Sequence, residues 1–294
     1  MDLPLPSQSY QTRSKPLSSQ RLINLYCEVY NDSGVMKTKS LIGTPGLSVF
    51  KDFSLVGSRV QGIRFFRTSL IVIIANKFYT ISESGTSNLI YDANDYETEY
   101  EDVDFVDNGQ NMMITFSSGN GYVVNFFADV FSVIKITDQN FMDNLAGSCS
   151  YCSGYFLYSY LETGIVGWSS LLDPLAWGNG LNYFSCEDSP DKITKIICNN
   201  RDLLAFHPKG VSFYYPTGDS SVWGKNTSVY VDKGSESKFS ICVDNNVFYY
   251  LGNDRCVYLL NGYTPQKIST PALENELGSY ANIENARGSI YTQE

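Results

Sequence analysis

Histidine is nearly absent from this chain of 294 residues, in which His207 is the only one. It lies beside Pro208 in a turn-like segment, and no serine or cysteine nucleophile motif accompanies it, so nucleophilic catalysis is not indicated. Phosphate loops of the G-x-G-x-x-G and Walker types are missing. A carboxylate pair for glycoside hydrolysis stays open because acids are plentiful, but the Ser-x-Asp-x-Gly-x-x-Trp box of sialidase-type propellers is absent. We therefore predict a protein that is not an enzyme and holds no cofactor.

Cysteines suited to metal binding are also lacking. Of seven cysteines, only Cys149 and Cys152 form a C-x-x-C pair, and neither a second pair nor a histidine cluster completes four ligands. We predict no metal site. The odd number of cysteines, scattered through expected strands, predicts reduced and buried thiols made in a cytosol.

Long hydrophobic runs and positive charge are scarce. No apolar run approaches the roughly 18 residues of a membrane span, and the first residues have no basic and apolar pattern of a signal peptide. Hydrophobic residues make up 43% and charged residues 18%, which favours a globular chain. The net charge of −10 argues against holding phosphate through a general basic field. A channel through which nucleic acid slides without sticking would tolerate this charge.

An acidic run occupies residues 91–107. A calcium loop needs oxygen ligands at set offsets with a glycine at its bend, and this run has no glycine before Gly109. We predict a solvated loop between structural units.

Residues 240–270 contain the clearest structural pattern, four short strands separated by three turns. The turns carry Asp, Asn and Gly, which accept positive φ or cap a turn with their own side chains. In the second strand, Val247 and Tyr249 point to one face and Phe248 and Tyr250 to the other, so both faces are apolar. A small sheet covered on both faces is typical of one blade in a β-propeller.

The same unit recurs along the chain. Its first turn falls near Thr68, Asn108, Ser153, Asn200 and Asn245, at steps of 40 to 47 residues, within the period of about 40–50 residues of four-stranded blades. We predict an all-β fold, a β-propeller-like array of about five to six four-stranded blades, with a sandwich or irregular barrel as the alternative.

The ends of the chain differ from these units. Residues 1–50 predict an N-terminal arm and β-hairpin, with strands at 19–30 and 36–42, and residues 51–294 predict the propeller domain, ending early in a sixth blade that opens at 287–289. The first segment, a neighbouring subunit or a longer chain would complete it. One helix is expected, with Thr270 as N-cap, Pro271 at its first position and Gly278 at its end.

Several motifs carry a family resemblance. Residues 19–26 and 42–47 resemble the opening of the packaged-DNA stabilisation proteins, or tail hub (nozzle) proteins, of short-tailed bacteriophages (podoviruses). Matches continue in order at residues 173–175, 187–193 and 261–270, so the resemblance covers most of the chain. Two departures are the early end and the family's Trp-rich strand in the fourth unit, which is Asp-Leu-Leu-Ala-Phe here at 202–206.

The resemblance implies a structural virion component that assembles in the host cytoplasm as a homohexameric ring in the viral tail, below the portal and its adaptor (head-completion) protein. Such a ring extends the DNA channel, retains packaged DNA until ejection, and docks a tail needle, spikes or fibres. Double-stranded DNA would pass without sequence specificity, and the free virion has no membrane partner.

Two further expectations concern particular side chains. We predict an assembly interface at Arg21, Asn24, Tyr26 and Pro45; the alternative is that Arg21 and Asn24 cap the local hairpin. The competing function is a glycan-binding or glycoside-cleaving β-propeller, in which the tyrosines and the three tryptophans would be stacking platforms: Trp168, Trp177 and Trp223.

Overall fold

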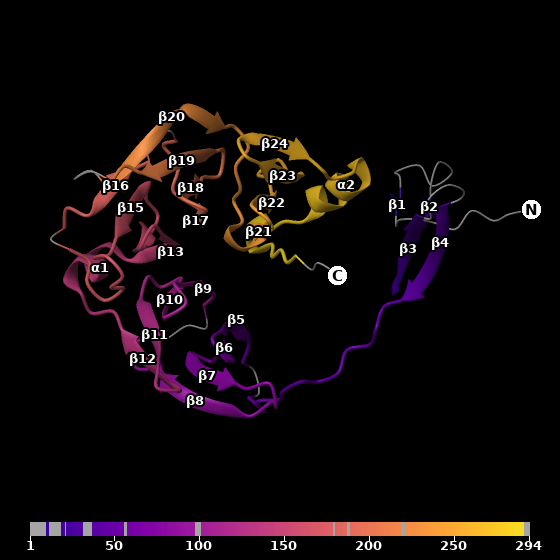
Figure 1. Ribbon diagram of the computed structural model, residues 1–294. Coiled ribbons are helices and arrows are strands. Elements are labelled where there is room, and N and C mark those ends of the chain that lie inside the picture. Colours follow the sequence, from indigo (N-terminus) through magenta and orange to yellow (C-terminus); the bar gives the residue numbers. More distant parts are fainter. Residues whose placement is uncertain are drawn as a thin grey trace, which may run out of the picture. The chain divides into compact units, whose positions relative to one another are not determined.

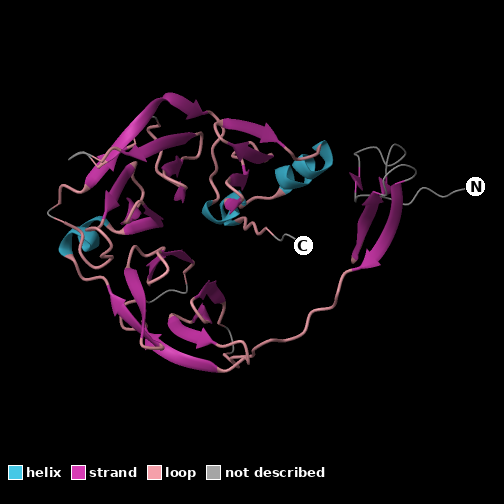
Figure 2. Ribbon diagram, viewed as in Figure 1, coloured by secondary structure: helices cyan, strands magenta, loops and turns pink. Residues whose placement is uncertain are grey.

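The computed structural model describes residues 10–11, 19–20, 22–31, 37–55, 58–97, 101–178, 180–186, 189–218 and 222–290. The chain divides into two compact units. The first unit combines Met1–Asp52 with Ser269–Ala281, and the second combines Phe53–Ile268 with Asn282–Glu294. β-Strands are the main secondary structure of the chain (Figure 2).

The second unit contains five four-stranded antiparallel sheets, each a meander of consecutive strands. Blade one is β5 (Val60–Phe66), β6 (Ser69–Ile74), β7 (Lys77–Ile81) and β8 (Ser87–Asp92); blade two is β9 (Val103–Asp107), β10 (Asn111–Phe116), β11 (Gly121–Phe127) and β12 (Val130–Lys135). Blade three is β13 (Ala146–Cys152), β14 (Tyr155–Tyr160), β15 (Ile165–Trp168) and β16 (Tyr183–Ser185). Blade four is β17 (Lys195–Asn199), β18 (Asp202–Phe206), β19 (Val211–Pro216) and β20 (Trp223–Val231), and blade five is β21 (Cys242–Asp244), β22 (Val247–Leu251), β23 (Val257–Asn261) and β24 (Thr264–Lys267).

Within this unit the sheets follow one another around a common centre (Figure 1). The first strand of each blade lies innermost, and the inner strands β9 and β17 both lie beside β13. The predicted turns separate the strands as expected: Ser153, Asn200 and Asn245 have positive φ, between 47° and 57°. The predicted all-β propeller is therefore confirmed, with five blades among the described residues.

The core lies between adjacent blades. Phe248 and Tyr250 of blade five contact Phe206 of blade four at ring-centroid distances of 6.0 and 5.4 Å. The coverage of both faces predicted for residues 240–270 is only half confirmed: Phe248 and Tyr250 are buried against blade four, whereas Val247 and Tyr249 on the other face are half-buried.

Blade one exposes the edges of one face of its sheet, whose middle is covered by Phe53 over Val72 and Ile74. Register places Ile63 opposite Val72 and Phe65 opposite Leu70, on the side away from Ile71 and Ile73, which pack against blade two. We call this the open face of blade one; its most exposed apolar side chains are Val60, Ile63, Phe65 and Leu89, at 48–59% exposure.

Three helical features differ from expectation. The predicted helix is confirmed as α2 (Pro271–Ser279) with Thr270 as N-cap, but it continues past Gly278, whose φ is not left-handed. A second helix, α1 (Gln139–Asn144), was not predicted because it spans six residues; the Asp138 side chain caps it. Short 3₁₀ turns form η1 (Lys238–Ser240) and η2 (Ile283–Asn285). No helix of the described residues has the length and apolarity to cross a membrane.

The first unit contains two small strand pairs. The expected hairpin is present as β3 (Leu25–Asn31) and β4 (Lys37–Gly43). The predicted single strand from residue 19 is interrupted at Asn24, which has a φ of 54°. Its beginning, β2 (Ser19–Gln20), pairs with β1 (Tyr10–Gln11).

The expected strand at the start of a sixth blade is absent from residues 286–290. This segment bonds to the η1 region instead. The Ser237 hydroxyl donates to the Ala286 carbonyl at 2.6 Å, and the Gly288 amide donates to the Phe239 carbonyl at 3.0 Å.

Candidate functional site

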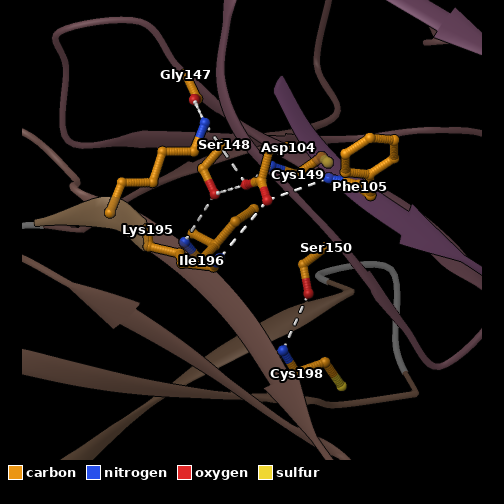
Figure 3. A network of polar contacts seen from close by, with 10 residues as sticks. Asp104, Phe105, Gly147, Ser148, Cys149, Ser150, Lys195, Ile196 and Cys198 are labelled. Carbon is orange, nitrogen blue, oxygen red and sulfur yellow. Dashed lines mark hydrogen bonds and ion pairs between the residues drawn. The ribbon is translucent and has the colours of Figure 1, made fainter. Parts of the chain in front are cut away.

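A buried ionic network lies where the inner strands of the propeller meet (Figure 3). Its centre is Asp104 on β9, whose side chain is only 8% exposed. The ammonium groups of Lys195 and Lys238 lie 3.6 Å from its Oδ1 and Oδ2 atoms, respectively. The Ser148 hydroxyl donates to Oδ2 at 2.9 Å and the Cys149 amide at 3.3 Å. One carboxylate thus joins blade two, blade three, blade four and the η1 turn.

The charge state of this network follows from its surroundings. Burial alone would raise the pKa of Asp104, but the positive charges of Lys195 and Lys238 and the hydrogen bonds from Ser148 and Cys149 lower the pKa to about 2. The carboxyl group is therefore ionised at neutral pH and has no proton to exchange there. The network therefore holds the blades together through charge and hydrogen bonds.

Two serine hydroxyls connect the inner strands of blades three and four. Ser148 accepts from the Ile196 amide at 3.3 Å, and Ser150 accepts from the Cys198 amide at 3.0 Å. Neighbouring inner strands belong to different sheets and share no backbone ladder, so these side chains provide acceptors for buried donors. The alternation of serines in β13 is the sequence signal that could have located this contact.

An aromatic ring and a second aspartate extend the network. Arg287 lies 4.8 Å from the centroid of Phe239, and Lys238 lies 5.3 Å from it. Asp102 forms ion pairs with Arg287 and with Arg59. The segment after η2 is therefore held by charge at the centre of the propeller.

The acidic run between blades one and two was wrongly predicted to be a solvated loop. Asp104 is in strand β9, and Glu97 is only 3% exposed. Its carboxylate accepts hydrogen bonds from the Tyr122 hydroxyl at 2.8 Å and the Ser118 hydroxyl at 2.7 Å. Burial is tolerated because these donors lie in the same blade interface.

The prediction of seven reduced, buried thiols was also wrong. Cys152 and Cys198 form a disulfide between β13 and β17, with Cα atoms 5.6 Å apart. Residues distant in sequence become neighbours through blade packing, which spacing alone does not reveal. Cys149 is a buried free thiol whose pKa is raised to about 12 by burial and by the charge of Asp104. Cys186 is buried, whereas three others are half-buried: Cys27, Cys242 and Cys256.

The remaining candidates for chemistry are parts of the core. His207 is fully buried, and its Nδ1 atom lies 3.3 Å from the Asp191 carbonyl oxygen. Trp168, Trp177 and Trp223 are at most 9% exposed, so they cannot be the surface stacking platforms of the competing hypothesis. No cluster of three potential metal ligands occurs in the described part of the chain.

The predicted assembly residues lie in the first unit, apart from the ionic network in sequence. Asn24 accepts from the Thr44 amide at 3.0 Å through its carbonyl, which closes the base of the β3–β4 hairpin. Tyr26 is opposite Ile42 and is 36% exposed, and Pro45 is exposed. Arg21 lies outside the described residues. Their role in assembly stays a prediction.

The matching family model agrees with the propeller fold. A family model described as bacteriophage P22 Gp10, beta-propeller, matches residues 1–294. Solved structures with similar folds include one entitled "YCF48 bound to D1 peptide", with 10% identity, a TM-score of 0.48, and coverage of 78% of this chain and 71% of that chain. Human WBSCR16 has 12% identity, a TM-score of 0.44, and coverage of 73% and 68%. No curated protein matches the sequence.

Proposed function

We propose that this chain, which belongs to the phage stabilisation family of bacteriophage P22 Gp10 β-propellers, is a tail hub (nozzle) protein. The family establishes a phage structural protein. The finer proposal is a homohexameric ring below the portal and its adaptor that extends the DNA channel, retains packaged DNA, and docks a needle, spikes or fibres. The protein would assemble in the host cytoplasm, remain in the tail and have no enzymatic activity.

The filled centre of the propeller is the observation that bears most directly on how such a channel is made. Asp104, Lys195 and Lys238 lie among the inner strands with side chains that are at most 15% exposed. Duplex DNA therefore cannot pass along the axis of one propeller. A DNA channel formed by this protein would then lie between several copies, which supports the proposal of a ring.

The net charge is compatible with the passage of DNA, and the open face of blade one supports assembly. The net charge of −10 disfavours tight phosphate binding, so DNA could slide past such a surface with little friction. The open face of blade one presents exposed Val60, Ile63, Phe65 and Leu89. Exposed apolar side chains grouped on one edge strand, as Val60, Ile63 and Phe65 are on β5, are typical of protein–protein contacts.

Cryo-electron microscopy of particles containing the protein tests the proposal. We expect a sixfold ring on the portal axis with a central hole wide enough for duplex DNA. Isolated propellers, or trimers at the particle periphery, would contradict it.

A further inference from the structure

A cleft of about 510 Å³ lies between blades four and five, away from the ionic network. It is bordered by the β17–β18, β21–β22 and β23–β24 turns, and the Asn199 amide group donates across it to the Asn246 carbonyl at 3.3 Å. Its volume falls in the range of about 300–1,000 Å³ typical of small-ligand sites. The two blades therefore form a surface hollow of ligand size.

The floor and one wall of this cleft are apolar. Leu204, Phe213 and Phe248 line its base and are at most 3% exposed. Tyr263 stands beside them with its ring 4.9 Å from that of Phe213 at an interplanar angle of 88°, and it remains 46% exposed. An aromatic ring held edge to face and half open to solvent offers a flat apolar surface to a ligand.

The rim is polar but carries both signs of charge. It contains Arg201 and Asp202 together with four asparagines: Asn199, Asn200, Asn246 and Asn261. The positive φ values of Asn200 and Asn246, 57° and 65°, explain why asparagine occurs at these two positions. The backbone of Asn199 and Asn261 does not require asparagine in this way. Amide, carboxylate and guanidinium groups together supply donors and acceptors around one aromatic wall.

We propose that this cleft binds a short neutral saccharide. Sugar hydroxyl groups both donate and accept, which matches side-chain amides beside Asp202 and Arg201. The C–H face of a sugar ring matches the Tyr263 ring. Because Arg201 is balanced by Asp202 and the whole chain is acidic, an anionic polymer fits the cleft poorly. An extended peptide fits less well too, because turns rather than a sheet edge form the walls.

Titration of the full chain with neutral di- to tetrasaccharides of glucose, galactose, mannose, rhamnose and N-acetylglucosamine tests the proposal, with saturation-transfer NMR followed by calorimetry. We expect at least one to bind. Tyr263→Ala should weaken binding by at least about tenfold, which corresponds to about 1.4 kcal/mol. Asp202→Asn, which keeps the size of the side chain, should weaken it to a similar degree.

Tyr215→Ala is the matched control, because Tyr215 is 45% exposed but does not line the cleft. It should leave the Kd within about twofold, and circular dichroism should show that all three variants are folded. The proposal fails if no saccharide binds at millimolar concentration. It also fails if both cleft variants bind like the wild type, or if unstructured peptides bind there and saccharides do not. The hub role rests separately on the family and on ring assembly, and its own failure would be the absence of a sixfold ring.

Discussion

At the scale of single residues, the buried charge of Asp104 connects elements that are far apart in the sequence. The Asp104 carboxylate pairs with Lys195 and Lys238 and accepts two hydrogen bonds from β13, so its partners come from three separate parts of the chain. A buried ion pair of this kind adds little net stability compared with apolar packing, but breaking it leaves an uncompensated charge. We therefore expect the network to contribute more to the specificity of the blade arrangement than to net stability.

Replacement of Asp104 tests this view. Asp104→Asn leaves Lys195 and Lys238 without their counter-charge, so the free energy of unfolding should fall by about 3–5 kcal/mol at pH 7. Denaturant titration measures it. Glu162→Gln is the control, since its pair with Lys192 is exposed on both sides, and should change stability by less than about 1 kcal/mol. Equal effects of the two variants would contradict a special role for the network.

The same carboxyl group predicts a pH dependence. Its pKa falls from the ordinary value of 3.8 to about 2 on folding, so the ionised form favours the folded state. This stabilisation is complete above pH 3.8 and is lost as the pH falls through about 2. The stability difference between wild type and Asp104→Asn should therefore shrink between pH 4 and pH 2. A constant difference across that interval would show that Asp104 does not titrate as proposed.

The buried carboxylate of Glu97 makes a separate prediction. Tyr122→Phe removes a hydroxyl that donates to it at 2.8 Å and leaves a buried acceptor underused. We expect a loss of about 1–3 kcal/mol in unfolding free energy, measured by denaturant titration. Tyr280→Phe removes an exposed hydrogen bond to Glu276 and should leave the melting temperature unchanged. If the free energy of unfolding of Tyr122→Phe equalled that of the wild type, water would have to replace the lost hydroxyl donor.

At the scale of elements, the spacing of turns predicted the blades because turn chemistry is local. Asn200 and Asn245 have the positive φ that their residue type accepts, wherever the rest of the chain lies. The burial of Asp104 could not be predicted in this way. It depends on Lys195 and Lys238, which come close only after blades two to four have packed. The Cys152–Cys198 pairing depends on the same packing.

That disulfide makes the contact between blades three and four testable. It closes a sequence separation of 46 residues, and its removal by Cys198→Ser should cost about 2–4 kcal/mol of unfolding free energy. Reductant should lower the melting temperature of the wild type but not of this variant. Cys27→Ser, a free cysteine in the first unit, is the control. Peptide mapping that finds Cys152 and Cys198 both as free thiols would contradict the pairing.

At the scale of the whole molecule, the open face of blade one and the predicted hub role both call for another protein surface that covers this face. An inner blade of a propeller is apolar on both sides because two neighbours cover it. Blade one is apolar on both sides as well, yet Ile63 and Phe65 on its open face remain more than half exposed. A protein that works inside an assembly can keep such a face, because another surface covers it there.

Phe65→Ser tests whether this face contributes to association. Phe65 is 59% exposed, so its replacement should change the fold's stability little, while apparent self-association in sedimentation experiments should weaken by at least about tenfold. Phe127→Ser is the matched control, because Phe127 is 82% exposed at the end of β11, in blade two. If self-association weakened equally in both variants, nonspecific hydrophobic contacts would explain it. If Phe65→Ser associated like the wild type, the contacts of the ring would have to lie elsewhere, and the first-unit residues Asn24, Tyr26 and Pro45 would be the next to replace.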